Sequence, residues 1–199
     1  MLNVGIEIEF TTPDIAEFLG KLYDANIDFK FYDKLDRHKR QSSKEVLVIK
    51  PDESLGKNGW EINIPPNLYG FEIKMILDIL KSCNIELTDK CALHVHIDTY
   101  YLSKFNLDNI YKYYVNSQRG LIEDSKTQGL YLDLNNELPE SPKDIKSRKT
   151  NLNFRAITKH GTLEHRIYKS TLNFEEVMWC VNQTVNIIDK GALYGYENN

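Results

Sequence analysis

One stretch of this chain places metal-ligating side chains at every second position. In residues 91–98, three aliphatic residues alternate with His94, His96 and Asp98. Alternation with a period of two is typical of a β-strand, whose successive side chains point to opposite faces. The stretch therefore predicts a strand with one apolar face for a core and one face that carries two imidazoles and a carboxylate.

Three further stretches, residues 4–10, 60–64 and 162–168, have the same construction. Their polar faces contribute four carboxylates and a guanidinium, which are Glu7, Glu9, Glu61, Glu164 and Arg166. In the last stretch His165 is expected on the core face and Tyr168 on the polar face. Our central hypothesis is that all four strands lie in one sheet and share one polar face.

The alternative is that these faces simply meet water, as one side of an antiparallel sheet often does. The distribution of lysines argues against this alternative. A water-exposed face in a chain with 19 lysines should carry some of them, but none lies in 4–10, 60–64, 93–98 or 162–168. Carboxylates gathered on a shared face repel one another and need cations to stay ionised. Oxygen ligands with one or two imidazoles favour Mg²⁺ or Mn²⁺ over zinc.

Three arginines lie on or beside the last predicted strands: Arg148, Arg155 and Arg166. Arginine is the usual partner of phosphate because its guanidinium is planar and bidentate. The alternatives are that Arg148 is a surface residue and that Arg155 pairs with a carboxylate. Carboxylates, a divalent metal and arginine together suggest phosphoryl transfer. The usual glycine-rich nucleotide loops are absent from the sequence, so a nucleotide would be held through metals and arginines.

Length and composition set wider bounds. At 199 residues we expect a single catalytic domain over 1–191 and a tail over 192–199. A net charge of −4 argues against a generic nucleic-acid binder. Three cysteines without paired spacing predict thiols in a reducing compartment. No apolar run approaches a membrane span and no secretory signal is present, so we expect a cytoplasmic protein.

The remaining patterns predict an irregular succession of helices and strands. Thr12 is expected to cap a helix that ends near Asn26, and Asn173 to cap a final helix that stops before Gly191. Further predicted elements are helices over 68–83 and 106–124, strands over 27–31, 45–50 and 85–88, and a strand pair from 149–157 to 161–168. Residues 33–44 are expected to form a solvated loop or, as the alternative, a basic lid over an anionic ligand. The long loop over 125–150 is a second candidate lid. Without a regular βαβ rhythm, this succession favours α+β with a largely antiparallel sheet.

An ordered set of motifs resembles a known family. The motifs are Gly5-Ile6-Glu7-Ile8-Glu9-Phe10, then Asp52-Glu53-Ser54 with Gly59-Trp60-Glu61, then Cys91 to Asp98, then Gly161-Thr162-Leu163-Glu164-His165-Arg166. In this order they resemble the amidoligases, which are carboxylate–amine ligases related in fold to glutamine synthetase and glutamate–cysteine ligase. The resemblance covers residues 4–181, and the ordered set is more specific than any single motif.

The resemblance implies a curved, largely antiparallel sheet with helices packed on one face, and ATP with two or more Mg²⁺ or Mn²⁺ ions on the concave face. The metal ligands carried over by position are Glu7, Glu9, Glu61, His94 and Glu164. Among these, Glu9 and Glu164 are expected to be catalytic together with Arg166, which would steady the transferring phosphoryl group.

The resemblance also implies a set of neighbouring contacts. His96 would be a further ligand or a substrate contact. Apart from the resemblance, the expected nucleotide-binding residues are Arg148, Arg155, Arg166 and His96. Asp52 and Ser54 would lie at the substrate or nucleotide rim. The sequence departs from the family at Ala92, where glycine is usual, and at His165, where the family tends to have phenylalanine. The chain is also compact for the fold, so its substrate pocket is expected to be either trimmed or completed by another subunit.

The implied reaction activates a carboxylate as an acyl phosphate, which an amine then converts to an amide or isopeptide. The acid and the amine are open between small molecules, peptides and proteins, and no membrane partner is expected. Two alternatives use the same residues: a metal-dependent phosphatase or hydrolase, and a non-catalytic module that binds Mg²⁺ and nucleotide. Product analysis distinguishes a hydrolase from a ligase, and a turnover assay distinguishes a non-catalytic module from an enzyme.

Overall fold

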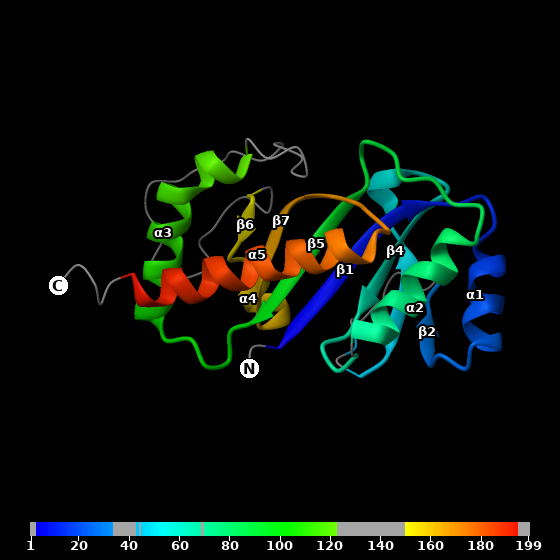
Figure 1. Ribbon diagram of the computed structural model, residues 1–199, viewed down its shortest axis with the longest axis horizontal. Helices are drawn as coiled ribbons and strands as arrows, with labels where there is room; N and C mark the ends of the chain where they lie inside the picture. The colour runs from blue at the N-terminus through cyan, green and yellow to red at the C-terminus, as the bar shows by residue number, and fades with distance from the viewer. Residues whose placement is uncertain (1–2, 34–42, 44, 69, 123–149, 195–199) are drawn as a thin grey trace. The chain divides into compact units, whose positions relative to one another are not determined.

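A computed structural model describes residues 3–33, 43, 45–68, 70–122 and 150–194 (Figure 1). The strands are β1 (Val4–Thr11), β2 (Phe29–Phe31), β3 (Leu47–Pro51), β4 (Gly59–Ile64), β5 (Ala92–Asp98), β6 (Leu152–Asn153) and β7 (Thr162–Lys169). The helices are α1 (Ile15–Asp24), α2 (Gly70–Lys81), α3 (Lys104–Ile122), α4 (Ala156–His160) and α5 (Phe174–Leu193), with a 3₁₀ turn at Glu53–Leu55.

The seven strands are hydrogen-bonded in the order β2-β3-β4-β1-β5-β7-β6. The pairs β1/β4, β3/β4 and β6/β7 are antiparallel, whereas β2/β3 is parallel. The sheet is therefore mixed, and the predicted α+β class is confirmed. The glutamine synthetase-like catalytic fold stays a prediction.

The chain divides into two compact units. The first, the 5–93 unit, consists of Gly5–Leu93 and Lys169–Met178 and holds β2, β3, β4, α1, α2 and nearly all of β1. The second, the 94–168 unit, consists of Met1–Val4, His94–Tyr168 and Trp179–Asn199 and holds α3, β6, α4 and most of β5, β7 and α5. The single catalytic domain over 1–191 stays a prediction.

The core of the 5–93 unit follows directly from the alternation in β1. Ile8 and Phe10 are completely buried, and the ring of Phe10 meets that of Phe18 from α1 edge-on at 6.1 Å. Helices α1 and α2 contact each other, and their inward faces bury apolar residues at helical spacing. Burial of such side chains contributes about 1.5–3 kcal/mol each, so this alternation fixes which face of β1 carries the glutamates.

Two predictions for the 5–93 unit are wrong. Helix α1 is capped by Asp14, whose Oδ1 accepts the N–H of Ala16 at 3.0 Å. Thr12 instead donates its hydroxyl to the carbonyl of Asn84 at 2.8 Å, so it ties the helix entry to a distant loop. The predicted strand over 85–88 is reduced to a single bridge between Thr11 and Glu86.

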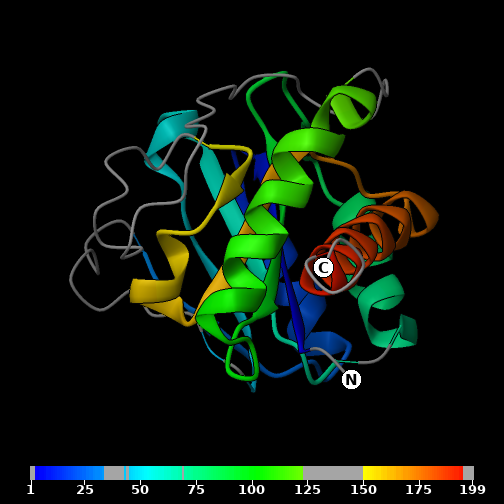
Figure 2. The same cartoon turned by 90° about the vertical axis from the view of Figure 1, so that its left-hand side faces the viewer.

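Helices α3 and α5 meet closely in the 94–168 unit, where Figure 2 shows them side by side. A Cβ added at Gly191 of α5 would lie 2.7 Å from Cα of Ile110 in α3, so glycine permits this approach. Helix α5 continues past Gly191 to Leu193, and the predicted helix end before Gly191 is therefore wrong. The predicted tail over 192–199 stays a prediction. The predicted cap is confirmed, because Asn173 Oδ1 accepts the N–H of Glu175 at 2.9 Å.

The strand pair predicted over 149–168 is interrupted by a helix. Strand β6 contains two residues only, and α4 follows before β7 begins. The side chain of Asn153 accepts the N–H of Arg155 at 3.0 Å, which turns the chain out of the strand. Gly161, with φ 71°, then ends α4 in the left-handed conformation that glycine favours. A short helix therefore replaces the predicted direct turn.

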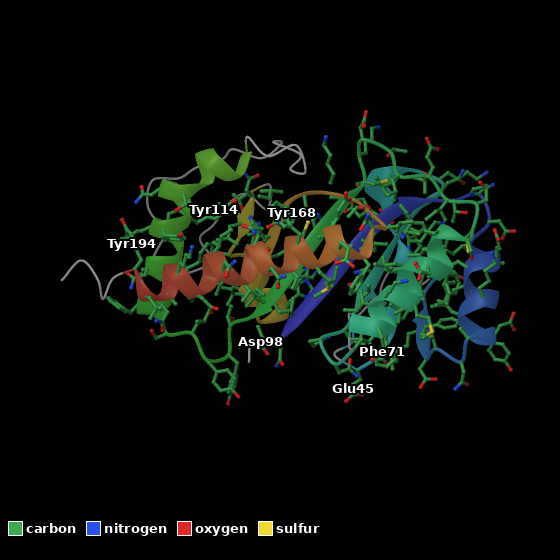
Figure 3. All side chains as sticks on the ribbon, viewed as in Figure 1. Glu45, Phe71, Asp98, Tyr114, Tyr168 and Tyr194 are labelled. Carbon is green, nitrogen blue, oxygen red and sulfur yellow. The ribbon has the colours of Figure 1, made fainter. Side chains whose placement is uncertain are left out.

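The core side of β7 carries a buried polar network. His165 is completely buried, with Nδ1 2.9 Å from Thr184 Oγ1 and Nε2 3.3 Å from the hydroxyl of Tyr114. Tyr168 is also fully buried and lies 3.2 Å from the same Thr184 hydroxyl (Figure 3 labels both tyrosines), so its predicted place on the polar face is wrong. Burial lowers the pKa of His165 to about 3 and raises the pKa of Tyr114.

Candidate functional site

The carboxylate of Glu164 is the centre of a polar cluster in the 94–168 unit. Its Oε1 lies 3.5 Å from His94 Nδ1, 3.9 Å from His96 Nε2 and 3.5 Å from Arg166 Nε. The alternation of β5 presents the two imidazoles, and the alternation of β7 presents the glutamate and the arginine. The structure thus brings together four of the predicted site residues, which we call the Glu164 cluster: His94, His96, Glu164 and Arg166.

Asn153 supports this cluster and was missed by the sequence analysis. It lies directly opposite Glu164 in the β6/β7 pairing, and its Nδ2 donates to Glu164 Oε2 at 2.6 Å. Both side chains are buried. The amide therefore holds one carboxylate oxygen and leaves the other directed at the imidazoles and the guanidinium. Asn153 could be recognised only from the register of β6 and β7, which the sequence alone does not specify.

Thr162 orients His96 in a similar way. The threonine hydroxyl lies 3.1 Å from His96 Nδ1, and the ring of His160 meets that of His96 edge-on at 6.4 Å. With Nδ1 at the hydroxyl, Nε2 is the ring nitrogen that faces Glu164. Hydrogen bonds of this kind fix the orientation of an imidazole and are common behind metal-binding histidines.

The predicted ligand Glu61 lies in a second polar cluster, within the 5–93 unit. Its Oε1 is 2.5 Å from Nζ of Lys50, which lies opposite it in the β3/β4 pairing, and also accepts from Asn63 Nδ2 at 3.0 Å. Burial, and then the charge of Glu7, raise the pKa of Glu61 to about 7. Burial alone would lower the pKa of Lys50, but Glu61 and Glu7 outweigh it and raise that pKa.

Lys50 was not among the predicted site residues. The four stretches on which the hypothesis was built contain no lysine, but the neighbouring strand β3 carries this one at its next-to-last position. Its sequence signal was a single lysine closing an otherwise apolar run, residues 46–49, just before Pro51. A lysine there could be identified as functional only once the β3/β4 register was known.

Glu9 has a defined structural contact. Its Oε2 accepts the backbone N–H of Ala92 at 2.8 Å, at the start of β5, and the side chain is buried. In the β1/β4 pairing it lies opposite Glu61. A carboxylate that accepts a buried backbone N–H satisfies that donor. Its predicted roles as a metal ligand and catalytic residue stay predictions.

Asp52 and Ser54 form a local turn. Asp52 Oδ1 accepts the N–H of Ser54 at 2.8 Å and so caps the 3₁₀ turn, while the Ser54 side chain is exposed. A Cβ added at Gly59 would lie 2.4 Å from the carbonyl oxygen of Asp52, which explains the glycine in this motif. This packing accounts for the Asp-Glu-Ser and Gly-Trp-Glu spacing without a ligand, and the predicted substrate contacts stay predictions.

Arg148 and Arg155 are not among the four residues that define the Glu164 cluster. Arg155 is exposed and immediately precedes α4. Arg148 lies outside the described residues, as do the candidate lids over 33–44 and 125–150 except for residues 33, 43 and 150. The nucleotide-binding roles of these two arginines stay predictions.

Comparison with known proteins gives no relative. No protein-family model, no curated protein and no solved structure matches the chain. The amidoligase resemblance therefore depends on the ordered motifs alone. Within the described part of the chain, no helix combines the length and apolar character that crossing a bilayer would require.

Proposed function

We propose that the protein is an ATP-dependent ligase that joins a carboxylate to an amine through an acyl phosphate. The observation that carries the proposal is the position of Glu164, whose carboxylate lies 3.5 Å from both an imidazole nitrogen of His94 and the guanidinium of Arg166. A carboxylate and an imidazole suit a divalent cation, and an adjacent arginine suits a phosphoryl group. The proposal includes a glutamine synthetase-like catalytic fold and a cytoplasmic location.

The proposed metal ligands in the 94–168 unit are His94 and Glu164, whose Nδ1 and Oε1 atoms lie 3.5 Å apart. A carboxylate and an imidazole are donors that Mg²⁺ and Mn²⁺ accept. Glu7 lies in the 5–93 unit, and its role as a ligand stays a prediction. A divalent ion at these ligands would neutralise charge on the phosphates of ATP. Asn153 would act behind the ligands by holding Glu164 in one orientation.

The proposed reaction has two steps. An oxygen of the substrate carboxylate attacks the γ-phosphorus of ATP, the bond from that phosphorus to the bridging oxygen breaks, and ADP leaves. The amine nitrogen then attacks the acyl carbon, the carbon–oxygen bond to phosphate breaks, and the nitrogen loses a proton as inorganic phosphate departs. Arg166 stabilises the charge on the transferring phosphoryl group, and His96 contacts the substrate or nucleotide.

Hydroxylamine tests this proposal without knowledge of the natural amine, because it converts an acyl phosphate to a hydroxamate, which forms a coloured complex with added Fe³⁺. The protein is incubated with Mg²⁺, ATP and pooled mono-, di- and amino-acid carboxylates and glutamate-ended peptides. We expect matched formation of ADP and hydroxamate. The Glu164→Gln variant should lose about 100-fold or more of this activity, whereas Glu86→Gln, which alters an exposed glutamate, should retain it.

Three results would contradict the proposal. Phosphate released from phosphate esters without ATP would identify a hydrolase. Nucleotide binding without ADP formation in any pool would identify a binding module. Activity that survives Glu164→Gln would remove the Glu164 cluster from the chemistry.

A further inference from the structure

We propose that Lys50 is a built-in cation that takes the place of a second metal ion beside Glu61. Glu61 is then not a metal ligand, and the protein binds one divalent ion per chain. The count of one rests on the proposed function, whereas the role of Lys50 stands on the geometry of the 5–93 unit alone.

The contact between the two side chains is close and sheltered. Lys50 Nζ lies 2.5 Å from Glu61 Oε1, and the two side chains are only 20% and 12% exposed. They come from directly opposed positions of β3 and β4, so the pairing of the strands itself aligns them. Breaking a buried pair by removing one partner leaves an uncompensated charge and is costly. The ammonium is therefore a fixed part of this cluster.

The charged groups around Lys50 are carboxylates. Glu61 interacts with the charge of Glu7, and Lys50 interacts with Glu61, Glu7 and Asp52. Glu9 lies opposite Glu61 on the next strand, but its carboxylate is engaged by the N–H of Ala92. Carboxylates this close to one another stay ionised only if a cation offsets their repulsion. Lys50 supplies that positive charge from within the chain.

One oxygen of the Glu61 carboxylate is already engaged while Lys50 is present. The same oxygen, Oε1, is 2.5 Å from Lys50 Nζ and accepts the amide of Asn63 at 3.0 Å. A Mg²⁺ ion would need this oxygen at about 2.0–2.1 Å in a near-octahedral set. Within the described residues, Glu61 belongs to no group of three acidic, histidine or cysteine side chains able to share one ion.

Counting bound Mn²⁺ tests the inference. The probe is Mn²⁺ alone, and the free ion is measured by electron paramagnetic resonance as the intact protein is titrated. We expect one ion per chain in the wild type and an unchanged count in Glu61→Gln. The Lys50→Met variant, which keeps the stem and removes the charge, should gain one further ion. That gain should disappear in the Lys50→Met/Glu61→Gln double variant.

Two controls separate charge from surface effects. Lys74→Met removes a lysine from the exposed pair with Asp78 and should leave the Mn²⁺ count unchanged. Lys50→Arg keeps the positive charge and should gain no ion. An equal Mn²⁺ count in wild type and Lys50→Met, or the loss of one wild-type ion in Glu61→Gln, would overturn the inference.

The Glu61→Gln measurement keeps the inference falsifiable even where Lys50→Met fails to fold. The same titration also distinguishes the two proposals. A wild type that binds no Mn²⁺ would contradict the proposed function, whereas a Glu61-dependent gain in Lys50→Met would still support the role of Lys50.

Discussion

Asn153 controls the orientation of the Glu164 carboxylate through a single hydrogen bond of 2.6 Å. We predict that Asn153→Ala weakens Mn²⁺ binding about 10–100-fold, the range typical of residues that orient metal ligands. Isothermal titration with Mn²⁺ measures this change. Asn58→Ala, which alters an exposed side chain, should bind Mn²⁺ like the wild type. Equal affinities in Asn153→Ala and the wild type would show that Glu164 needs no such support.

The buried imidazole of His165 makes stability depend on pH. Its pKa is lowered to about 3 in the folded state from an ordinary value of 6.5, because burial disfavours the charged form. Between these values the unfolded chain binds more protons at this site, so the free energy of unfolding falls as the pH falls. Above pH 6.5 the imidazole is neutral in both states and this dependence vanishes.

We therefore compare wild type with His165→Phe, which cannot be protonated at this position. The stability advantage of the wild type should shrink by about 2 kcal/mol between pH 7 and pH 5, as one proton contributes about 1.4 kcal/mol per pH unit below pH 6.5. Urea denaturation at the two pH values measures it. A stability difference between the two proteins that is the same at both pH values would contradict the assignment of a neutral buried imidazole.

At this scale the sequence predicted the side chains on the strands but not their partners. Alternation alone identified His94, His96, Glu164 and Arg166, because a period of two assigns each residue to a face. Asn153 and Lys50 escaped, since each becomes significant only through the residue opposite it on a neighbouring strand. Strand register depends on which residues pair across the sheet, which one sequence does not specify.

Among the helices, two glycines give opposite predictions for the same substitution. Gly20 lies inside α1, and an added Cβ would meet nothing within 4 Å. Gly191 lies inside α5, where an added Cβ would be 2.7 Å from the backbone of Ile110. Alanine in an open helical position stabilises by about 0.5–1 kcal/mol, because glycine loses more entropy on folding. At Gly191 the helices would have to separate first.

We predict that Gly20→Ala raises the free energy of unfolding and that Gly191→Ala lowers it by about 1–3 kcal/mol, the usual cost of overpacking. Chemical denaturation of both variants measures the two signs. Stabilisation by Gly191→Ala would show that α3 and α5 do not approach each other as closely as described.

The secondary-structure elements show where sequence patterns are reliable. The strand over 4–10 and the helix capped by Asn173 were confirmed because alternation and capping are local properties. The strand predicted over 149–157 was wrong because the Asn153 side chain and the backbone of Arg155 form a turn after two strand residues. Polar side chains compete with strand pairing in this way, and the hydrophobic pattern does not show it.

Across the whole molecule, the predicted site residues belong to two compact units. The 94–168 unit contains the Glu164 cluster, while the 5–93 unit contains Glu7, Glu9 and Glu61 with Lys50. We interpret the first as the chemical centre of the proposed ligase and the second as a cluster whose charge is offset within the chain. In the proposed function the divalent ion has an imidazole ligand, His94.

Pulsed electron paramagnetic resonance of bound Mn²⁺ tests this claim most directly, because it detects the nitrogen of a coordinated imidazole. The account predicts nitrogen coupling in the wild type and its loss in His94→Gln. His165→Phe, which removes an imidazole from the separate network with Thr184 and Tyr114, should keep it. Bound Mn²⁺ without nitrogen coupling in the wild type, or coupling that persists in His94→Gln, would contradict the account.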